Sequence, residues 1–258
     1  MKRLSILAIS VLGLAVSIDA RAEMSPEEVQ ALLVEIDERQ HAPGDYKALA
    51  LIEQKRGGQS DAVYQAAIYR RDRDERFMLL FVKPRTEAGK GYLRIDRNMF
   101  MYDPTVGKWE RRTERERLMG TDTRRADLDE WNLASDYQGS FVADESLGKF
   151  AVAHLELKAK DGASVPYPTI HIWVDKATHN VLKRQDLALS GRLMRTAYYP
   201  KWQVVKGPGG LEVHYPEQMR IFDEVEKGNR TTVVITDLDL TQLDPNIFTK
   251  AWLESRSR

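Results

Sequence analysis

The sequence predicts a mainly β protein built on one antiparallel sheet. Short apolar or alternating segments recur at even intervals from Tyr46 to Leu240, and most are separated by turns that contain glycine or asparagine. No linker divides the chain. We therefore expect a single domain over residues 23–258.

The first 22 residues carry the pattern of an export signal. Lys2-Arg3 precedes an uncharged apolar stretch, and Ala20-Arg21-Ala22 is a small-residue cleavage site. We expect a signal peptide over residues 1–22, cleaved before Glu23. An uncleaved anchor is the alternative, although about 20 apolar residues are needed to cross a bilayer. Because the chain has no cysteine, we expect a periplasmic protein without lipid attachment.

A helix is predicted at the start of the mature chain. Ser25 is a good N-cap, Pro26 suits the first helical position, and Glu28 completes a capping box. One apolar stripe follows, formed by Val29, Leu32, Leu33 and Ile36. The pattern predicts a helix that packs on the sheet, and a sharper interpretation makes it a lid over a cavity.

The first half of the sheet begins with a predicted hairpin, Tyr46–Lys55 and Ala62–Arg71. The charged run from Arg70 to Arg76 is predicted to be a solvated turn. Pro84 ends the next strand because proline cannot donate to a ladder. The further strands predicted in this half are Phe77–Val82, Tyr92–Asp96, Met99–Tyr102 and Lys108–Glu110.

The second half follows a loop with a short helix over Asp122–Ser135. Gly139-Ser140 is interpreted as a turn. The predicted strands are Phe150–Ala159, Thr169–Asp175, Val181–Leu189, Arg192–Val205, Leu211–Phe222 and Thr231–Leu240. A last short helix starts at Asp244-Pro245 and carries Ile247, Phe248, Ala251 and Trp252.

Composition and motifs argue against several functional classes. The 39 Lys and Arg residues are balanced by 39 Asp and Glu residues, whereas nucleic-acid binders usually carry a basic excess. The five histidines follow no metal-ligand spacing, and no nucleophile elbow, phosphate loop or dinucleotide fingerprint occurs. We find no catalytic constellation, and we expect neither enzymatic activity nor a cofactor or metal.

Several short motifs, in their order and spacing, resemble one family. Gly120-Thr121-Asp122 is the most specific of them, and the likeness extends from Phe77 to Leu253. The other motifs are Gly91-Tyr92-Leu93 after Pro84, Met101-Tyr102-Asp103-Pro104, Lys108-Trp109-Glu110-Arg111-Arg112, Asp127-Leu128, Trp173-Val174-Asp175-Lys176 with Leu182-Lys183, and Phe248-Thr249 with Trp252-Leu253. Together they resemble the periplasmic outer-membrane lipoprotein-sorting proteins, in particular the LolA-like branch associated with RND-type exporters. Arg124-Arg125 departs from the aromatic residue that members often carry there.

The resemblance implies a strongly curved antiparallel sheet, an incomplete β-barrel, with helices over its concave face. It also implies a non-enzymatic periplasmic carrier for lipid or lipoprotein acyl chains, acting in outer-membrane trafficking or beside an RND-type inner-membrane transporter. We expect a monomer that associates with membranes only transiently. Burial of an acyl chain contributes roughly 0.8 kcal/mol per methylene, so an apolar pocket can hold one without polar contacts.

The bulky faces of the predicted elements are the candidates for lining such a cavity. For each of them, packing in an ordinary core is the alternative, because one sequence does not show which face is concave. The candidates are Leu32, Leu33, Ile36, Met78, Leu80, Val82, Leu93, Ile95, Phe100, Tyr102, Ile170, Ile172, Val174, Leu187, Leu189, Val233 and Ile235.

A second function class fits the same pattern. The scaffold would then be a structural or interaction module whose apolar interior is only its core, and its partner would be an exporter or another envelope protein. Bound lipid would distinguish the carrier from this module.

Overall fold

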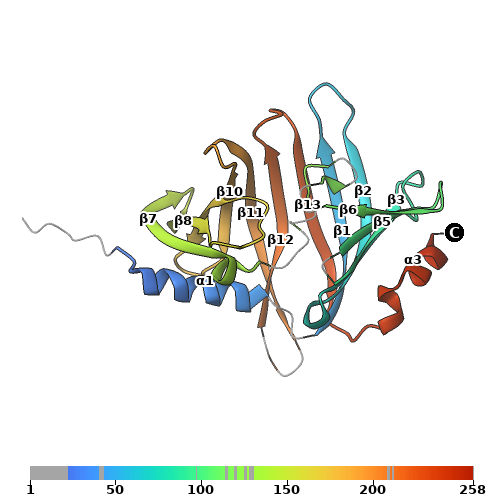
Figure 1. The fold of residues 1–258 in the computed structure, drawn as a ribbon, viewed down its shortest axis with the longest axis horizontal. Coiled ribbons are helices and arrows are strands. Elements are labelled where there is room, and N and C mark those ends of the chain that lie inside the picture. The colour runs from blue at the N-terminus through green and yellow to red at the C-terminus, as the bar shows by residue number, and fades with distance from the viewer. Residues whose placement is uncertain are drawn as a thin grey trace, which may run out of the picture.

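One antiparallel sheet of 13 strands organises the molecule (Figure 1). The computed structural model describes residues 23–40, 44–96, 98–113, 116–118, 121–124, 127, 131–207, 210 and 212–257. The strand order is β6-β5-β4-β3-β2-β1-β13-β12-β11-β10-β9-β8-β7. Every neighbouring pair is consecutive in the chain except β1 and β13. The sheet is strongly curved and open, with β6 and β7 at its edges, which confirms the predicted fold class.

The elements have the following bounds. One half of the sheet consists of β1 (Asp45–Lys55), β2 (Ala62–Arg71), β3 (Arg76–Lys83), β4 (Gly91–Ile95), β5 (Asn98–Asp103) and β6 (Lys108–Arg112). The other consists of β7 (Tyr137–Leu147), β8 (Phe150–Ala159), β9 (Thr169–Asp175), β10 (Val181–Leu187), β11 (Leu193–Lys206), β12 (Glu212–Asp223) and β13 (Arg230–Asp239). The helices are α1 (Pro26–Gln40), α2 (Leu133–Asp136) and α3 (Lys250–Arg256), with 3-10 helices η1 (Asp72–Asp74) and η5 (Pro245–Phe248).

Most predicted elements are confirmed, and the ends of each predicted strand fall within two residues of the observed ones. The last helix is divided at Thr249 into η5 and α3. Within the described residues, no helix is long and apolar enough to span a membrane. The predicted signal peptide, residues 1–22, lies outside the described residues, and so does Gly120 of the family motif.

The N-terminal helix α1 begins with the predicted capping box. The backbone N–H of Ser25 donates to Glu28 Oε2 (2.7 Å), and that of Glu28 donates to Ser25 Oγ (3.2 Å). The predicted stripe is buried against the sheet, with Leu33 fully inaccessible to solvent. It belongs to a core cluster that includes Leu155, Ile170 and Ile172 of β8 and β9. Packing of this apolar face stabilises the helix, as is usual for short helices.

Strand β7 was not predicted, because Gly139-Ser140 was interpreted as a turn. The structure places both residues inside the strand, where Gly139 pairs with Leu157 of β8. Glycine is needed there because α1 lies very close. A Cβ on Gly139 would lie 2.7 Å from Val29 Cγ1 and 3.0 Å from Leu33 Cδ1.

Replacing Gly139 with valine is therefore expected to push α1 away from β7 and to lower the free energy of unfolding by about 1–3 kcal/mol. Thermal and urea denaturation would measure the loss. Ser140→Val, at the next and exposed position of the same strand, is the matched control and should change stability little. Equal stability of the two variants would show that α1 does not need this close approach.

The connection from β6 to β7 joins the two edges of the sheet, and described residues near both of its ends lie on the face that α1 covers. Its residue Leu118 packs with Phe77, Leu79 and Val233 from the central strands. Further along, Leu133 packs in the same cluster as α1. The connection thus contributes to covering the part of this face that α1 does not reach.

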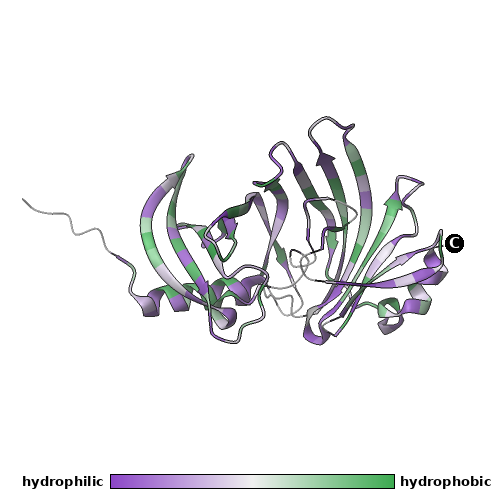
Figure 2. Cartoon of the chain, turned by 45° about the horizontal axis from the view of Figure 1, so that its top comes forward, coloured by the Kyte–Doolittle hydropathy of each residue, from purple (hydrophilic) through white to green (hydrophobic). Residues whose placement is uncertain are grey.

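Among the described residues, η5 and α3 cover one end of the opposite face. Met78 and Leu93 lie on the face opposite to the residues that pack with Leu118. They pack instead with Phe248 and Leu253. The resemblance implied helices over the concave face; α1 lies there, and η5 and α3 add a cover on the opposite face. Both faces of β3 and β4 consequently carry buried apolar side chains. Figure 2 shows how hydrophobic and hydrophilic residues alternate along the strands farther from this region.

Candidate functional site

An apolar pocket of about 50 Å³ lies between the central strands and the β6–β7 connection. The strand register builds its floor, because Ile68 of β2 pairs with Leu79 of β3, and Ala50 of β1 pairs with Ile235 of β13. Other floor residues are Ile52, Phe77, Phe81 and Val233. Leu118, Thr121 and Thr123 of the connection line the other side. The pocket is therefore a covered apolar space on the concave face.

A more polar pocket of about 60 Å³ adjoins it and shares Arg70, Asp127, Tyr215 and Met219 with it. Aromatic rings meet edge to face around this second space. The ring centroids of Tyr46 and Tyr215 are 5.6 Å apart, and those of Trp131 and Tyr199 are 5.4 Å apart. The Tyr46 hydroxyl donates to the Tyr215 hydroxyl over 3.3 Å. The site thus changes from apolar to polar along its length.

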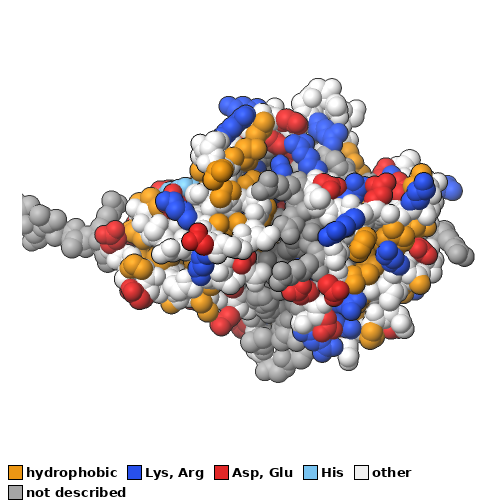
Figure 3. All heavy atoms as spheres, viewed as in Figure 1, with side chains coloured by type: hydrophobic (Ala, Val, Ile, Leu, Met, Phe, Trp, Pro, Cys, Tyr) orange, Lys and Arg blue, Asp and Glu red, His pale blue; other side chains and the backbone are white. Residues whose placement is uncertain are grey.

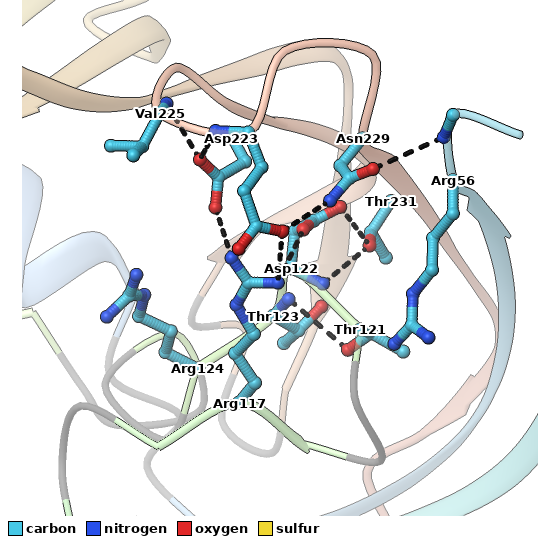
Figure 4. Close-up of polar contacts among 12 residues, drawn as sticks. Arg56, Arg117, Thr121, Asp122, Thr123, Arg124, Asp223, Val225, Asn229 and Thr231 are labelled. Atoms are coloured by element: carbon cyan, nitrogen blue, oxygen red, sulfur yellow. Dashed lines mark hydrogen bonds and ion pairs between the residues drawn. The ribbon is translucent and has the colours of Figure 1, made fainter.

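A polar network holds the cover in place (Figure 4). The backbone N–H of Asp122 donates to Thr231 Oγ1 (2.8 Å), and that hydroxyl donates back to Asp122 Oδ2 (3.1 Å). Arg117 forms an ion pair with Asp223 at the end of β12. Burial raises the pKa of Asp122, although Thr231 and Arg117 favour its charged form. These contacts fix the Thr121-Asp122 part of the family motif to β12 and β13.

A buried chain of charges supports the polar end. Arg184 Nε lies 2.6 Å from Asp186 Oδ1, and Arg195 Nε lies 3.3 Å from Asp186 Oδ2. Arg195 Nη2 lies 2.8 Å from Asp127 Oδ1, so the chain ends at a residue that lines both pockets. Burial opposes the charge of Arg195, but Asp127 and Asp186 hold its pKa above the ordinary value. Burial also raises the pKa of the neighbouring Tyr137 to about 12, so its hydroxyl stays protonated.

Polar side-chain contacts hold the C-terminal end of α1 beside the polar pocket. Arg39 Nη2 lies 2.6 Å from His214 Nδ1 of β12, and Glu35 Oε1 lies 2.9 Å from His179 Nδ1 in the β9–β10 turn. Burial and the Arg39 charge lower the pKa of His214. The imidazole of His214 is therefore neutral at pH 7 and can accept a hydrogen bond from Arg39.

The structure separates the predicted cavity residues into four groups. Val233 and Ile235 line the apolar pocket. A second group lies on the same face but in the packed core under α1, and comprises Leu32, Leu33, Ile36, Ile170, Ile172 and Val174. A third group contacts η5 or α3 on the opposite face, and comprises Met78, Leu93, Ile95, Phe100 and Tyr102. The remaining four, Leu80, Val82, Leu187 and Leu189, are absent from the lining of both pockets.

The face of β3 to β5 that was predicted to line the cavity therefore needs correction. The alternation was correct, but the residues that face the pocket side are Phe77, Leu79, Phe81, Tyr92 and Met99. Periodicity does not distinguish two apolar faces, and here the second one is covered by α3. Leu187 at the end of β10 and Leu189 beyond it were also predicted to line the cavity, yet the buried side of β10 is occupied by Arg184 and Asp186, and Leu189 is 91% exposed.

Arg70 and Arg71 were predicted to lie in a solvated turn, and this is wrong. Both belong to β2 and are buried, because Arg71 pairs with Asp45 and Arg70 lies over the ring of Tyr46. The alternation of Ala66 and Ile68 continues to Arg70, and this signal could have placed Arg70 on the pocket face.

Two histidines form a separate cluster on the outer face of β8 and β9. His154 Nε2 lies 2.8 Å from His171 Nδ1, and His154 Nδ1 lies 2.8 Å from Glu145 Oε1. The His154 ring stacks on Trp173 at 4.2 Å. Burial lowers the pKa of His171, which favours the neutral ring. In the part of the chain that the structure describes, no three His, Asp or Glu residues are arranged to hold a metal ion.

The model of a protein family described as "Uncharacterized protein" matches residues 73–255. No curated protein sequence matches the chain. The fold is similar to that of a DUF1329 family protein from Desulfovibrio piger, with 20% identity and a TM-score of 0.78 over 88% of this chain and 98% of that chain.

Two further solved structures carry descriptions that bear on the predicted resemblance. A LolA superfamily protein from Nitrosomonas europaea shares 22% identity, with a TM-score of 0.71 over 86% of this chain and 98% of that chain. An outer membrane lipoprotein-sorting protein domain from Vibrio parahaemolyticus shares 20% identity, with a TM-score of 0.77 over 89% of this chain and 100% of that chain. These likenesses confirm the LolA-like fold, and the link to an RND-type exporter stays a prediction.

Proposed function

The chain belongs to the uncharacterized protein family whose model matches residues 73–255, and we propose that it is a periplasmic, non-enzymatic carrier or binding protein for lipid or lipoprotein acyl chains. The observation that supports this proposal most directly is the covered apolar pocket on the concave face. The export pattern of residues 1–22 and the LolA-like fold agree with it.

The pocket has the chemistry that an acyl chain needs. Its floor presents aliphatic and aromatic side chains from β1, β2, β3 and β13, with Phe81 and Ile52 deeply buried. Each buried square ångström of apolar surface contributes about 25 cal/mol, so such a floor retains a chain without specific polar contacts. The aromatic residues around the polar pocket then mark the end at which a headgroup would lie.

Binding requires the pocket to enlarge. A cavity of about 50 Å³ is small beside the roughly 300–1,000 Å³ of pockets that bind small ligands. Leu118, Thr121 and Thr123 cover the floor, and polar contacts of Asp122 and Arg117 hold the described part of this cover to β13 and β12. We infer that these residues move outward when a chain enters.

Filling the pocket tests the proposal. Ala50 is buried on the floor, and Ala50→Phe should weaken binding of a neutral fluorescent monoacylglycerol by at least about tenfold, because the ring occupies the space for the chain. Leu51→Phe is the matched control, since Leu51 is the next residue of β1 and its side chain is exposed on the other face. Fluorescence titration, with thermal denaturation to verify folding, would measure both variants.

Native mass spectrometry of the protein purified without detergent supplies the second readout. A bound lipid or acylated peptide that is lost in Ala50→Phe and retained in Leu51→Phe would support the carrier. A wild-type protein that carries no lipid and takes up no acyl probe would refute the proposal. The scaffold would then fit the alternative, a module that binds an envelope partner.

A further inference from the structure

Thr123 carries a buried hydroxyl group in the cover of the apolar pocket. The residue is 6% exposed and lines this pocket together with Leu118 and Thr121. Thr123 Oγ1 is buried and has no hydrogen-bond partner among the residues that the structure describes. An unpaired hydroxyl costs free energy, because folding removes its hydrogen bonds to water and provides none in return. Most buried polar groups of proteins are paired, so this one calls for an explanation.

The hydroxyl group of Thr121, two residues earlier, is paired. Thr121 Oγ1 donates to the carbonyl oxygen of Leu118 (2.7 Å) and accepts from the backbone N–H of Thr123 (3.2 Å). The carbonyl oxygen of Thr123 in turn accepts from the backbone N–H of Leu118 (2.8 Å). Other buried side-chain atoms of the described chain also lack a hydrogen-bond partner, but none of their residues lines the apolar or the polar pocket. The unpaired hydroxyl of Thr123 therefore belongs to the candidate site.

The fold brings Thr123 close to the junction of the two pockets. On one side of it in the chain, Asp122 is bound to Thr231 of β13 (Figure 4). On the other side, the backbone N–H of Arg124 donates to Asp127 Oδ2 (2.8 Å), and Asp127 lines both pockets. Both neighbours of Thr123 are thus fixed, so its side chain leaves the cover only when these bonds break.

We infer that Thr123 Oγ1 donates a hydrogen bond to the carbonyl oxygen of an ester-linked or amide-linked acyl chain. This inference rests on the proposed function and adds a specificity to it. A carbonyl oxygen is an acceptor, and an acyl chain carries it where the hydrocarbon ends and the headgroup begins. That position matches the junction between an apolar and a polar pocket. An ether-linked alkyl chain has the same hydrocarbon but no carbonyl, so it would leave the hydroxyl unpaired.

The test compares neutral amphiphiles that share one 18-carbon chain. Monoolein is an ester, N-oleoylserinol an amide and 1-O-oleylglycerol an ether, and each would displace a neutral fluorescent monoacylglycerol from the wild-type protein. We expect the ester or the amide to bind about 5–30-fold more tightly than the ether. The tighter of the two carbonyl compounds identifies the linkage, an ester as in glycerolipids or an amide as in an acylated amino terminus.

Variants of Thr123 then locate this preference. The readout is the ratio of the dissociation constants of the ether and the carbonyl compound, in which a general change of affinity cancels. Thr123→Val has nearly the same shape without the hydroxyl and should bring the ratio close to one, whereas Thr123→Ser should keep most of it. Thr236→Val is the control and should keep the whole ratio, because Thr236 is an exposed residue of β13 outside both pockets.

Thermal denaturation of the protein without ligand tests the unpaired hydroxyl itself. Thr123→Val should not lower the Tm, because it removes a buried polar group that has no partner. Thr121→Val should lower the Tm, because the bond to the Leu118 carbonyl is lost. Equal losses in the two variants would show that the Thr123 hydroxyl is already paired, and this would overturn the inference.

The binding outcomes separate this inference from the proposed function. Equal binding of the ester, the amide and the ether by the wild-type protein would overturn the carbonyl contact and leave the acyl carrier intact. A preference for the carbonyl that persists in Thr123→Val would overturn the role of Thr123. Binding of none of the three compounds would refute the proposed function itself.

Discussion

Replacing Asp186 with alanine is expected to lower the free energy of unfolding by about 3–5 kcal/mol, because it leaves buried arginine charge without its partner. The Asp186 side chain is almost inaccessible to solvent and lies between two guanidinium groups, 2.6 Å from Arg184 Nε and 3.3 Å from Arg195 Nε. Arg195 keeps Asp127 in this variant, but Arg184 loses the carboxylate that offsets its burial. Urea denaturation followed by tryptophan fluorescence would measure the change.

An exposed ion pair provides the comparison for Asp186. Asp144 Oδ2 lies 2.7 Å from Lys176 Nζ, a similar distance, but both side chains are partly solvated. Asp144→Ala should therefore cost no more than about 1 kcal/mol. Equal losses in the two variants would mean that the buried chain of charges adds no more stability than a surface pair.

The Asp186→Ala variant also links stability to the pocket. Asp186 helps to hold Arg195, and Arg195 holds Asp127 at the junction of the two pockets. Loss of Asp186 should thus also weaken the positioning of Asp127, which acyl-probe titration of the folded variant would detect. The chain of charges couples the half of the sheet under α1 to the half that contains the apolar pocket.

Strand positions were predictable because alternation and turn residues are local signals. The hairpin of β1 and β2 and the ladder of β8 and β9 were found in this way with correct pairing partners. Gly139 was misinterpreted for the opposite reason. Its role depends on the close approach of α1, a contact between segments about a hundred residues apart.

The face of each strand was harder to predict than its position. In β3, Phe77 and Met78 are both buried, one towards the pocket and the other towards η5 and α3. Only the placement of the C-terminal helix decides between them. In β10, the buried face carries the polar residues Arg184 and Asp186, so hydrophobic residues do not mark it in the sequence. Their burial is possible because their charges neutralise each other. The burial of Arg70 was not predicted for a similar reason, because Arg70 begins a charged run in the sequence.

The surface also shows why composition alone did not locate the site. Acidic and basic side chains are intermixed over the face in Figure 3, with hydrophobic side chains between them. Several charges that line or support the two pockets lie instead below the surface, at Arg70 and along the chain from Arg184 to Asp127. Their arrangement depends on which face of each strand is buried, and the alternation in one sequence does not show that when both faces carry bulky or charged residues.

Asp45→Ala is the second variant with a large expected effect, again a loss of about 3–5 kcal/mol in the free energy of unfolding. Asp45 Oδ1 accepts a hydrogen bond from Arg71 Nε (2.8 Å), and Oδ2 accepts from Arg71 Nη2 (2.6 Å) and from the backbone N–H of Leu243 (2.7 Å). The group joins β1 and β2 to the segment that leads into η5 and α3. Asp61→Ala, which removes an exposed partner of Lys55, should leave stability nearly unchanged.

The effect of Asp45 should depend on pH in a defined direction. The hydrogen bonds from Arg71 hold the pKa of Asp45 below its ordinary value of 3.8, although burial acts in the opposite direction. The unfolded chain therefore takes up a proton at a higher pH than the folded protein does, and the stabilisation is complete above pH 3.8 and is lost as the pH falls through the folded pKa. The stability difference between wild type and Asp45→Ala should be constant near neutral pH and shrink below pH 4. A difference that grew in acid would contradict this assignment.

The position of Asp45 also predicts which part of the protein opens first in the variant. Arg71 Nη2 donates to the carbonyl oxygen of Leu243 (2.7 Å), so loss of the carboxylate releases both the arginine and the chain beyond β13. Phe248 and Leu253 would then separate from Met78 and Leu93, while α1 keeps its own core on the other half of the sheet. Hydrogen exchange should therefore increase in α3 before it increases in α1. Uniform acceleration in both helices would mean that the two halves unfold together, and that the ion pair stabilises the whole sheet rather than the C-terminal cover.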